Sequence, residues 1–221
     1  AVLASYATAA ARAAAPDRLS DPLAQRVTAG KMTPADRVAA LGRISIVGNL
    51  SDLADADLVI EAIIEAADAK SALLADLEKV VPPNTVLATN TSSLRVEGLG
   101  AGLTHPERLL GLHFFNPAPA MRLVELVSHR RTDAVAAARA RQVTEEAGKT
   151  VIACPDSPGF IVNRCTRPYY GEALAMLEEG RRAAEIDGAM QAAGYRLGPF
   201  SLIDLIGSDI NLAATEVIYD A

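Results

Sequence analysis

The stretch DLVIEAIIEAADAKSALLADLEKVVPPNTVLA, residues 57–88, contains a strand, a helix and a second strand in succession. Residues 57–63 and 85–88 are short apolar runs rich in β-branched side chains, which is typical of strands. Between them, residues 66–80 repeat apolar side chains close to the 3.6-residue period of a helix. Nearly continuous apolar strands that alternate with helices predict a parallel sheet buried on both faces by those helices.

The same alternation extends in both directions along the chain. Upstream, the first fifteen residues are alanine-rich and favour helix, and we expect a helical hairpin near residues 16–42. The remaining elements of this part are a helix over 133–147 and strands over 44–47, 109–115, 123–127 and 150–153. The pattern as a whole predicts an α/β fold with a doubly wound sheet.

A turn-rich segment, Cys154-Pro155-Asp156-Ser157-Pro158-Gly159, separates this part from a helical one. Beyond it, the sequence predicts helices over 160–179 and 183–193, a third opening at 198–200 and a fourth that runs to the end. We therefore expect an all-α C-terminal domain that begins near residue 155.

Composition excludes several classes of function. The 221 residues carry a net charge of −6, and no Lys/Arg cluster is present, so binding to nucleic acid or to anionic lipid has no support. Two cysteines cannot form a disulfide framework or a four-ligand zinc site. Because the sequence shows neither a signal peptide nor an apolar run of about 18 residues, we expect a cytoplasmic protein that does not enter a membrane.

A histidine and a glutamate in neighbouring strands are the first candidates for chemistry. His113 ends a predicted strand, and ligands of open parallel sheets bind at the carboxyl ends of strands, where a histidine can act as a base. Glu125, twelve positions on, interrupts an apolar strand, where a carboxylate is costly unless it is paired. The two residues suit each other as partners. The alternatives are a histidine packed inertly against phenylalanines and a glutamate that faces water.

Other polar residues lie near predicted strand ends. The run Thr89–Ser93 offers hydroxyl and backbone N–H groups to a ligand, or it forms a plain capping loop. Glu65 follows a strand and Lys70 lies early in the next helix, which fits a ligand pocket or a solvated helix start. Asn163 lies one turn into a predicted apolar helix, where its low propensity suggests that it faces a cleft or bridges helices.

Taken together, these segments resemble the L-3-hydroxyacyl-CoA dehydrogenase family, including bacterial 3-hydroxybutyryl-CoA dehydrogenases. The resemblance implies a Rossmann-like NAD-binding domain over residues 1–154, incomplete at its N-terminus. It also implies an all-α domain over residues 155–221 that binds substrate and forms a homodimer. The matching runs, in the family's order and spacing, are residues 56–62, 89–93, 111–117, 123–127, 156–164 and 194–200.

The resemblance also implies the reaction, which is NAD-dependent oxidation of (S)-3-hydroxyacyl-CoA to 3-oxoacyl-CoA in fatty-acid or related metabolism. In this scheme His113 is the catalytic base, and Glu125 is its carboxylate partner. Ser92 and Asn163 hydrogen-bond the reacting oxygens of the substrate. No metal is expected.

The resemblance places the cofactor pocket at Glu65, Lys70, Ser92 and Asn116, around the ribose and nicotinamide. The helical hairpin is similar to the part of the family that contacts the CoA moiety, although no individual CoA contact can be assigned.

One family feature is missing from the sequence. The family opens with a strand and Gly-x-Gly-x-x-Gly, which cradles a pyrophosphate, and usually continues for several dozen residues past position 221. Because His113, Glu125, Ser92 and Asn163 are all present, a partial copy of a working dehydrogenase is favoured over a chain that does not bind NAD. Two other functions stay open. One is a dehydrogenase of the L-gulonate and lambda-crystallin branch, and the other is a non-catalytic dimerising protein on the same fold.

Overall fold

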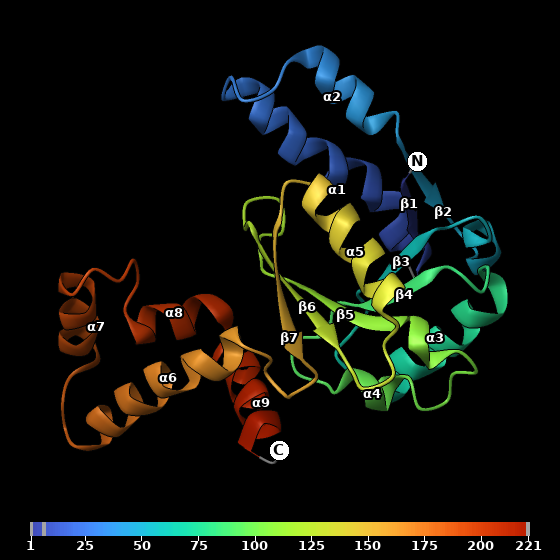
Figure 1. The fold of residues 1–221 in the computed structure, drawn as a ribbon. Helices are drawn as coiled ribbons and strands as arrows, with labels where there is room; N and C mark the ends of the chain where they lie inside the picture. The colour runs from blue at the N-terminus through green and yellow to red at the C-terminus, as the bar shows by residue number, and fades with distance from the viewer. Residues whose placement is uncertain (1, 6–7, 220–221) are drawn as a thin grey trace. The chain divides into compact units, whose positions relative to one another are not determined.

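The computed structural model describes residues 2–5 and 8–219 (Figure 1). The chain divides into two compact units. The first comprises Ala1–Asp57 with Ala75–Thr85, and the second comprises Leu58–Leu74 with Val86–Ala221.

The first unit contains a small parallel sheet and a helical hairpin. Strand β1 (Val2–Ser5) pairs in parallel with β2 (Ile44–Val47). Between them lie helices α1 (Ala9–Thr28) and α2 (Pro34–Leu41), and the short 3₁₀ helix η1 (Leu50–Leu53) follows β2. The hydroxyls of Thr8 and Thr33 cap the two long helices by accepting hydrogen bonds from their first turns.

The sequence-based expectation for this region was wrong in two respects. Val2–Ser5 is a strand, because pairing with β2 outweighs a weak helical preference. The hairpin begins at Ala9 and not near residue 16, because α1 continues through Pro16 and Pro22. A proline removes one backbone donor, but its fixed φ is helical, and the flanking alanine-rich turns continue past it.

A five-stranded sheet forms the centre of the second unit, with strand order β3-β4-β5-β6-β7. Its strands are β3 (Leu58–Glu61), β4 (Val86–Thr89), β5 (Leu109–Phe114), β6 (Leu123–Ser128) and β7 (Thr150–Pro155). All neighbouring pairs are parallel except β5 and β6. Residues 115–122 join these two directly, and a connection this short cannot hold the crossover that a parallel pair requires.

Four helical segments lie between these strands along the chain. Helix α3 (Ala67–Val80) follows β3, the short α4 (Val96–Leu99) and η2 (Pro106–Arg108) precede β5, and α5 (Ala134–Glu146) lies between β6 and β7. Figure 1 shows α5 lying along the sheet, and α5 contacts β4, β5, β6 and β7.

The core lies between the sheet and α5. Alternate strand residues pack with the buried alanines of α5, and these are Val86, Ala88, Leu110, Leu112, Val124, Leu126, Ala136 and Ala140. Because side chains alternate along a strand, the odd-numbered positions of β5 and β6 lie on the opposite face. His113 and Glu125 are on that second face.

The end of the chain is helical, as the sequence predicts. Helices α6 (Val162–Glu178), α7 (Ala183–Ala192), α8 (Pro199–Ile206) and α9 (Ser208–Tyr219) pack on one another. The Asp187 carboxylate of α7 accepts hydrogen bonds from the backbone of Phe200 and Ser201 and so caps α8. A Cβ at Gly198 would lie 2.3 Å from the Asp187 carboxyl carbon, so this approach requires glycine. Across residues 2–5 and 8–219, no helix is long and apolar enough to span a membrane.

Candidate active site

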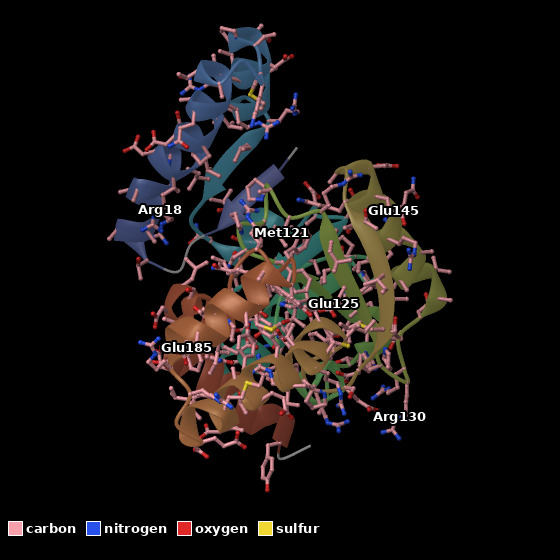
Figure 2. All side chains as sticks on the ribbon, turned by 90° about the vertical axis from the view of Figure 1, so that its left-hand side faces the viewer. Arg18, Met121, Glu125, Arg130, Glu145 and Glu185 are labelled. Atoms are coloured by element: carbon pink, nitrogen blue, oxygen red, sulfur yellow. The ribbon has the colours of Figure 1, made fainter. Side chains whose placement is uncertain are left out.

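His113 and Glu125 form a buried pair on the sheet. They are direct partners in the antiparallel register of β5 and β6, and His113 Nδ1 lies 2.7 Å from Glu125 Oε2. Their exposed fractions are 6% and 0%. Figure 2 places Glu125 among packed side chains, whereas Arg130, on the turn after β6, points outward. The pairing predicted from sequence is confirmed, and the antiparallel register is its structural cause.

The second oxygen of Glu125 is held by the start of helix α6. Oε1 accepts hydrogen bonds from the backbone N–H groups of Ile161 at 2.9 Å and Val162 at 2.8 Å. Burial would raise the pKa of Glu125, but the hydrogen bonds from His113, Val162 and Ile161 outweigh it and hold the pKa below its ordinary value. The carboxylate therefore stays ionised and favours the histidine tautomer that has its proton on Nδ1. In that tautomer, Nε2, on the other side of the ring, has no proton and carries the lone pair.

A backbone reversal at the start of the helical region brings those two N–H groups to Glu125. Gly159 and Phe160 both have positive φ angles, +74° and +47°. A phenylalanine rarely adopts this conformation, and its strain is offset only where the surroundings fix it. The Phe160 ring packs 5.7 Å from the His113 ring, and Phe115 packs on that histidine at 4.5 Å. These apolar rings keep water from the histidine while its Nδ1 stays paired.

The loop after β4 is organised by Glu65. One oxygen of this carboxylate, Oε1, accepts hydrogen bonds from the Thr91 hydroxyl at 2.5 Å and the Ser92 backbone N–H at 2.9 Å. It also accepts them from the backbone N–H and the hydroxyl of Ser93, both at 3.2 Å. The Ser92 hydroxyl is also within 3.3 Å. Burial would raise the pKa of Glu65, but the hydrogen bonds from Thr91 and Ser92 and the charge of Lys70 hold it below its ordinary value. The loop is thus fixed around a permanent negative charge.

Lys70 lies beneath this loop and is not a solvated residue of a helix start. Its side chain is 1% exposed, and Nζ lies 2.8 Å from Glu61 Oε1, 3.2 Å from the Ile63 carbonyl oxygen and 3.4 Å from Glu65 Oε2. Sequence reasoning did not single out Glu61. The signal was available, because Glu61 interrupts an apolar strand in the same way as Glu125.

Asn163 connects the helical region with the Ser92 loop. Its side-chain Nδ2 donates to the backbone oxygen of Ser92 at 3.2 Å. Because α6 begins at Val162, Asn163 lies in the first turn and not one turn into the helix. The structure therefore brings His113, Glu125, Ser92 and Asn163 together around one end of the sheet. Asn116 lies just past the end of β5, where it is exposed.

The donors and acceptors at this end of the sheet suit the reacting end of a nicotinamide dinucleotide. The Glu65 side chain is 36% exposed and Ser92 is partly exposed, so a carboxylate and a hydroxyl are available to sugar hydroxyls or an amide. Within the part of the chain that the structure describes, no glycine-rich strand–helix turn supplies a pyrophosphate cradle. Within the same residues, no cluster of three or more His, Cys, Asp or Glu side chains is placed to hold a metal.

Comparison with known proteins identifies the family. Residues 2–157 match the family described as 3-hydroxyacyl-CoA dehydrogenase, NAD binding domain, and residues 159–221 match the 3-hydroxyacyl-CoA dehydrogenase C-terminal domain. The chain belongs to the 3-hydroxyacyl-CoA dehydrogenase family. The family model indicates NAD as the cofactor, as the resemblance implied, and the fold is the Rossmann NAD-binding fold followed by a helical C-terminal domain.

Individual relatives agree with this assignment. The chain is 47% identical over 201 residues to 3-hydroxyadipyl-CoA dehydrogenase of Escherichia coli K12, with 90% of this chain and 42% of the relative covered. It is 43% identical over 197 residues to 3-hydroxybutyryl-CoA dehydrogenase of Mycobacterium tuberculosis, covering 87% of this chain and 69% of the relative.

Solved structures show the same likeness. The crystal structure of 3-hydroxybutyryl-CoA dehydrogenase from Escherichia coli K12 superposes with a TM-score of 0.95 at 45% identity, over 99% of this chain and 47% of the other. The crystal structure of (S)-3-hydroxybutyryl-CoA dehydrogenase PaaH1 from Ralstonia eutropha superposes with a TM-score of 0.96 at 36% identity. The match covers 99% of this chain and 78% of the other. This chain thus spans only part of the length of its relatives, 42% of the first-named enzyme.

Proposed function

We propose that the protein containing this chain oxidises (S)-3-hydroxyacyl-CoA to 3-oxoacyl-CoA with NAD. The observation that carries the proposal is the 2.7 Å contact between His113 Nδ1 and Glu125 Oε2, buried at the end of β5. A histidine whose Nδ1 is held by an ionised carboxylate has a basic Nε2, which is the group that an alcohol oxidation requires. Membership of the family supports the choice of substrate class.

In the proposed mechanism, His113 Nε2 takes the proton of the substrate 3-hydroxyl as the C3–O bond gains double-bond character. NAD, when bound, supplies the acceptor for the hydride that leaves C3. Glu125 donates no proton, and its fixed negative charge stabilises the imidazolium that forms on His113. Ser92 and Asn163 hydrogen-bond the reacting oxygens. General-base catalysis of this kind contributes a factor of about 10²–10⁴ in rate.

The remaining proposals are supported by the family and by the geometry. Glu65, Lys70, Ser92 and Asn116 form the cofactor pocket around the ribose and nicotinamide. For Lys70 this role is indirect, since its ammonium already contacts Glu61, Ile63 and Glu65. The domain organisation we propose is an NAD-binding domain over residues 1–154 and a helical domain over residues 155–221. The ends of that division, Ala1 and residues 220–221, lie outside the described residues.

We also propose a cytoplasmic homodimer that forms through the helical domain. Large apolar side chains are exposed on three of its helices, and these are Leu174, Leu177, Leu205, Ile206, Ile210 and Leu212. A surface of this kind typically marks a protein interface.

The test is turnover by the complete protein and by its His113→Gln variant. Wild-type protein should form NADH from (S)-3-hydroxybutyryl-CoA, and His113→Gln should reduce kcat by about 10²–10⁴ because the base is absent. NAD affinity, measured by calorimetry, should stay nearly unchanged. Wild-type turnover by the variant would overturn the role of His113.

One control substrate and one physical measurement separate the alternatives. NADH formation from L-gulonate, and not from the acyl-CoA, would assign the chain to the gulonate branch. Tight self-association with no NADH formation from any hydroxyacyl-CoA would indicate a non-catalytic dimerising protein.

A further inference from the structure

We infer that Glu61 is a positioning residue. Its buried ion pair with Lys70 sets the place of Glu65 and, through Glu65, of the Ser92 loop. The role in catalysis rests on the proposed function, whereas the positioning of the loop can be measured without it.

The contacts of Glu61 join the ends of two neighbouring strands. Glu61 is the last residue of β3 and is 3% exposed. Its Oε1 accepts hydrogen bonds from Lys70 Nζ at 2.8 Å and the Ile63 backbone at 2.6 Å, and its Oε2 accepts one from the Thr89 hydroxyl at 2.7 Å. Both oxygens of this carboxylate are thus engaged, by residues of β4, of α3 and of the segment after β3, which fixes the ammonium of Lys70 in one place.

Lys70 transmits that placement to Glu65. An ammonium group has three N–H donors, and those of Lys70 face Glu61 Oε1, the Ile63 carbonyl oxygen and Glu65 Oε2. Glu65 Oε2 lies 3.4 Å from Nζ, while its Oε1 holds the backbone of Ser92 and Ser93. A continuous series of contacts therefore runs from Glu61 through Lys70 and Glu65 to the loop. No residue of the series needs to touch substrate for Glu61 to affect the reaction.

A purely structural ion pair would behave differently when it is replaced. A buried pair that serves stability alone can be exchanged for a neutral pair of similar size with little loss, whereas removal of one partner leaves a buried charge uncompensated. Here Lys70 faces a third partner, Glu65. Neutralising both Glu61 and Lys70 restores charge balance between these two but leaves Glu65 without its cation. In the double variant, the thermal stability of the protein and the position of the Ser92 loop can therefore change independently.

The experiment compares Glu61→Gln with the double variant Glu61→Gln/Lys70→Gln in the complete protein. The first readout is amide hydrogen exchange at Ser92 and Ser93, whose N–H groups bond Glu65. The second is thermal unfolding, and the third is kcat/KM for (S)-3-hydroxybutyryl-CoA with NAD. The matched control is Lys79→Met, which removes an exposed ion pair with Asp76 on the same helix.

We expect exchange at these two amides to accelerate at least about tenfold in both variants, and kcat/KM to fall by about 10–10² because the loop is displaced. The double variant should regain most of the thermal stability that Glu61→Gln loses, but neither the slow exchange nor the activity. Lys79→Met should match the wild type in all three readouts.

Slow exchange and full activity in a folded Glu61→Gln variant would overturn the inference. Recovery of exchange, activity and stability together in the double variant would also overturn it, because the pair would then be structural only. If Glu61→Gln does not fold, Glu61→Asp takes its place, because it keeps the charge but draws the carboxylate away from Lys70, and the same two outcomes then decide. Absence of NADH formation by the wild type would refute the proposed function, while the exchange measurement would still test the role of Glu61.

Discussion

Two glutamates are buried in apolar strands of the same sheet, and they are held by different partners. Glu61 accepts hydrogen bonds from a lysine, a backbone N–H and a threonine hydroxyl. Glu125 accepts them from two backbone N–H groups and is paired with His113. Both carboxylates are satisfied on both oxygens, as burial requires.

The difference lies in the cation partner. Lysine presents a fixed ammonium group with three donors, whereas an imidazole has two ring nitrogens and can take up a proton at one while it donates from the other. The Glu61 cluster is therefore suited to hold a position, and the Glu125 cluster is suited to move a proton. Burial of a carboxylate alone does not identify a catalytic residue, and the chemistry of its partner does.

The largest effect that this comparison predicts is that of Glu125→Gln. The amide cannot stabilise an imidazolium on His113, and it favours the wrong tautomer, so kcat should fall by about 10²–10⁴. Glu125→Gln should also change the shape of the profile of steady-state rate against pH, because it removes the ionised carboxylate beside the base. Glu61→Gln should keep the shape of the pH profile at a lower rate. If both variants changed the profile in the same way, the distinction between the two clusters would be wrong.

A smaller effect is expected on stability in acid. The pKa of Glu125 in the folded protein lies below its ordinary value of 4.5, so the unfolded state binds the proton more readily. The stability that Glu125 contributes is present above about pH 4.5 and is lost as the pH falls through its folded pKa. Urea unfolding at a series of pH values should therefore show a shallower decline for Glu125→Gln than for the wild type. An equal decline in both proteins would show that Glu125 contributes nothing to it.

The sequence was sufficient for much of this picture. The strands and helices of the second unit follow from apolar runs, helical period and turn residues, and the pairing of His113 with Glu125 follows from the cost of a buried charge. Strand β1 was missed because a four-residue alanine-containing run has no strong preference outside its pair with β2. Glu61 was missed although the same argument about buried charge applied to it.

Other features of the site could not be predicted because no side-chain type signals them. Glu125 is held by the backbone N–H groups of Ile161 and Val162, and any residue type except proline supplies such a donor. The reversal that aims them depends on a positive φ at Phe160, where the sequence shows no glycine.

The smallest effect is expected from Asn163→Ala, and it addresses how the two regions are joined. Asn163 is next to Val162, whose N–H bonds Glu125, and its side chain donates to the Ser92 backbone oxygen of the loop held by Glu65. Loss of one such hydrogen bond costs about 0.5–1.5 kcal/mol, so the free energy of unfolding should fall by roughly that amount. If Asn163 also binds a reacting oxygen, the fold-loss in kcat/KM should exceed the fold-increase in the amide exchange rate of Ser92. Asn163→Asp is the matched control, because it keeps the size and removes the donor. A variant with accelerated exchange at Ser92 and unchanged kcat/KM would show that Asn163 only joins the helix to the loop, and that the contact with substrate is made by other residues.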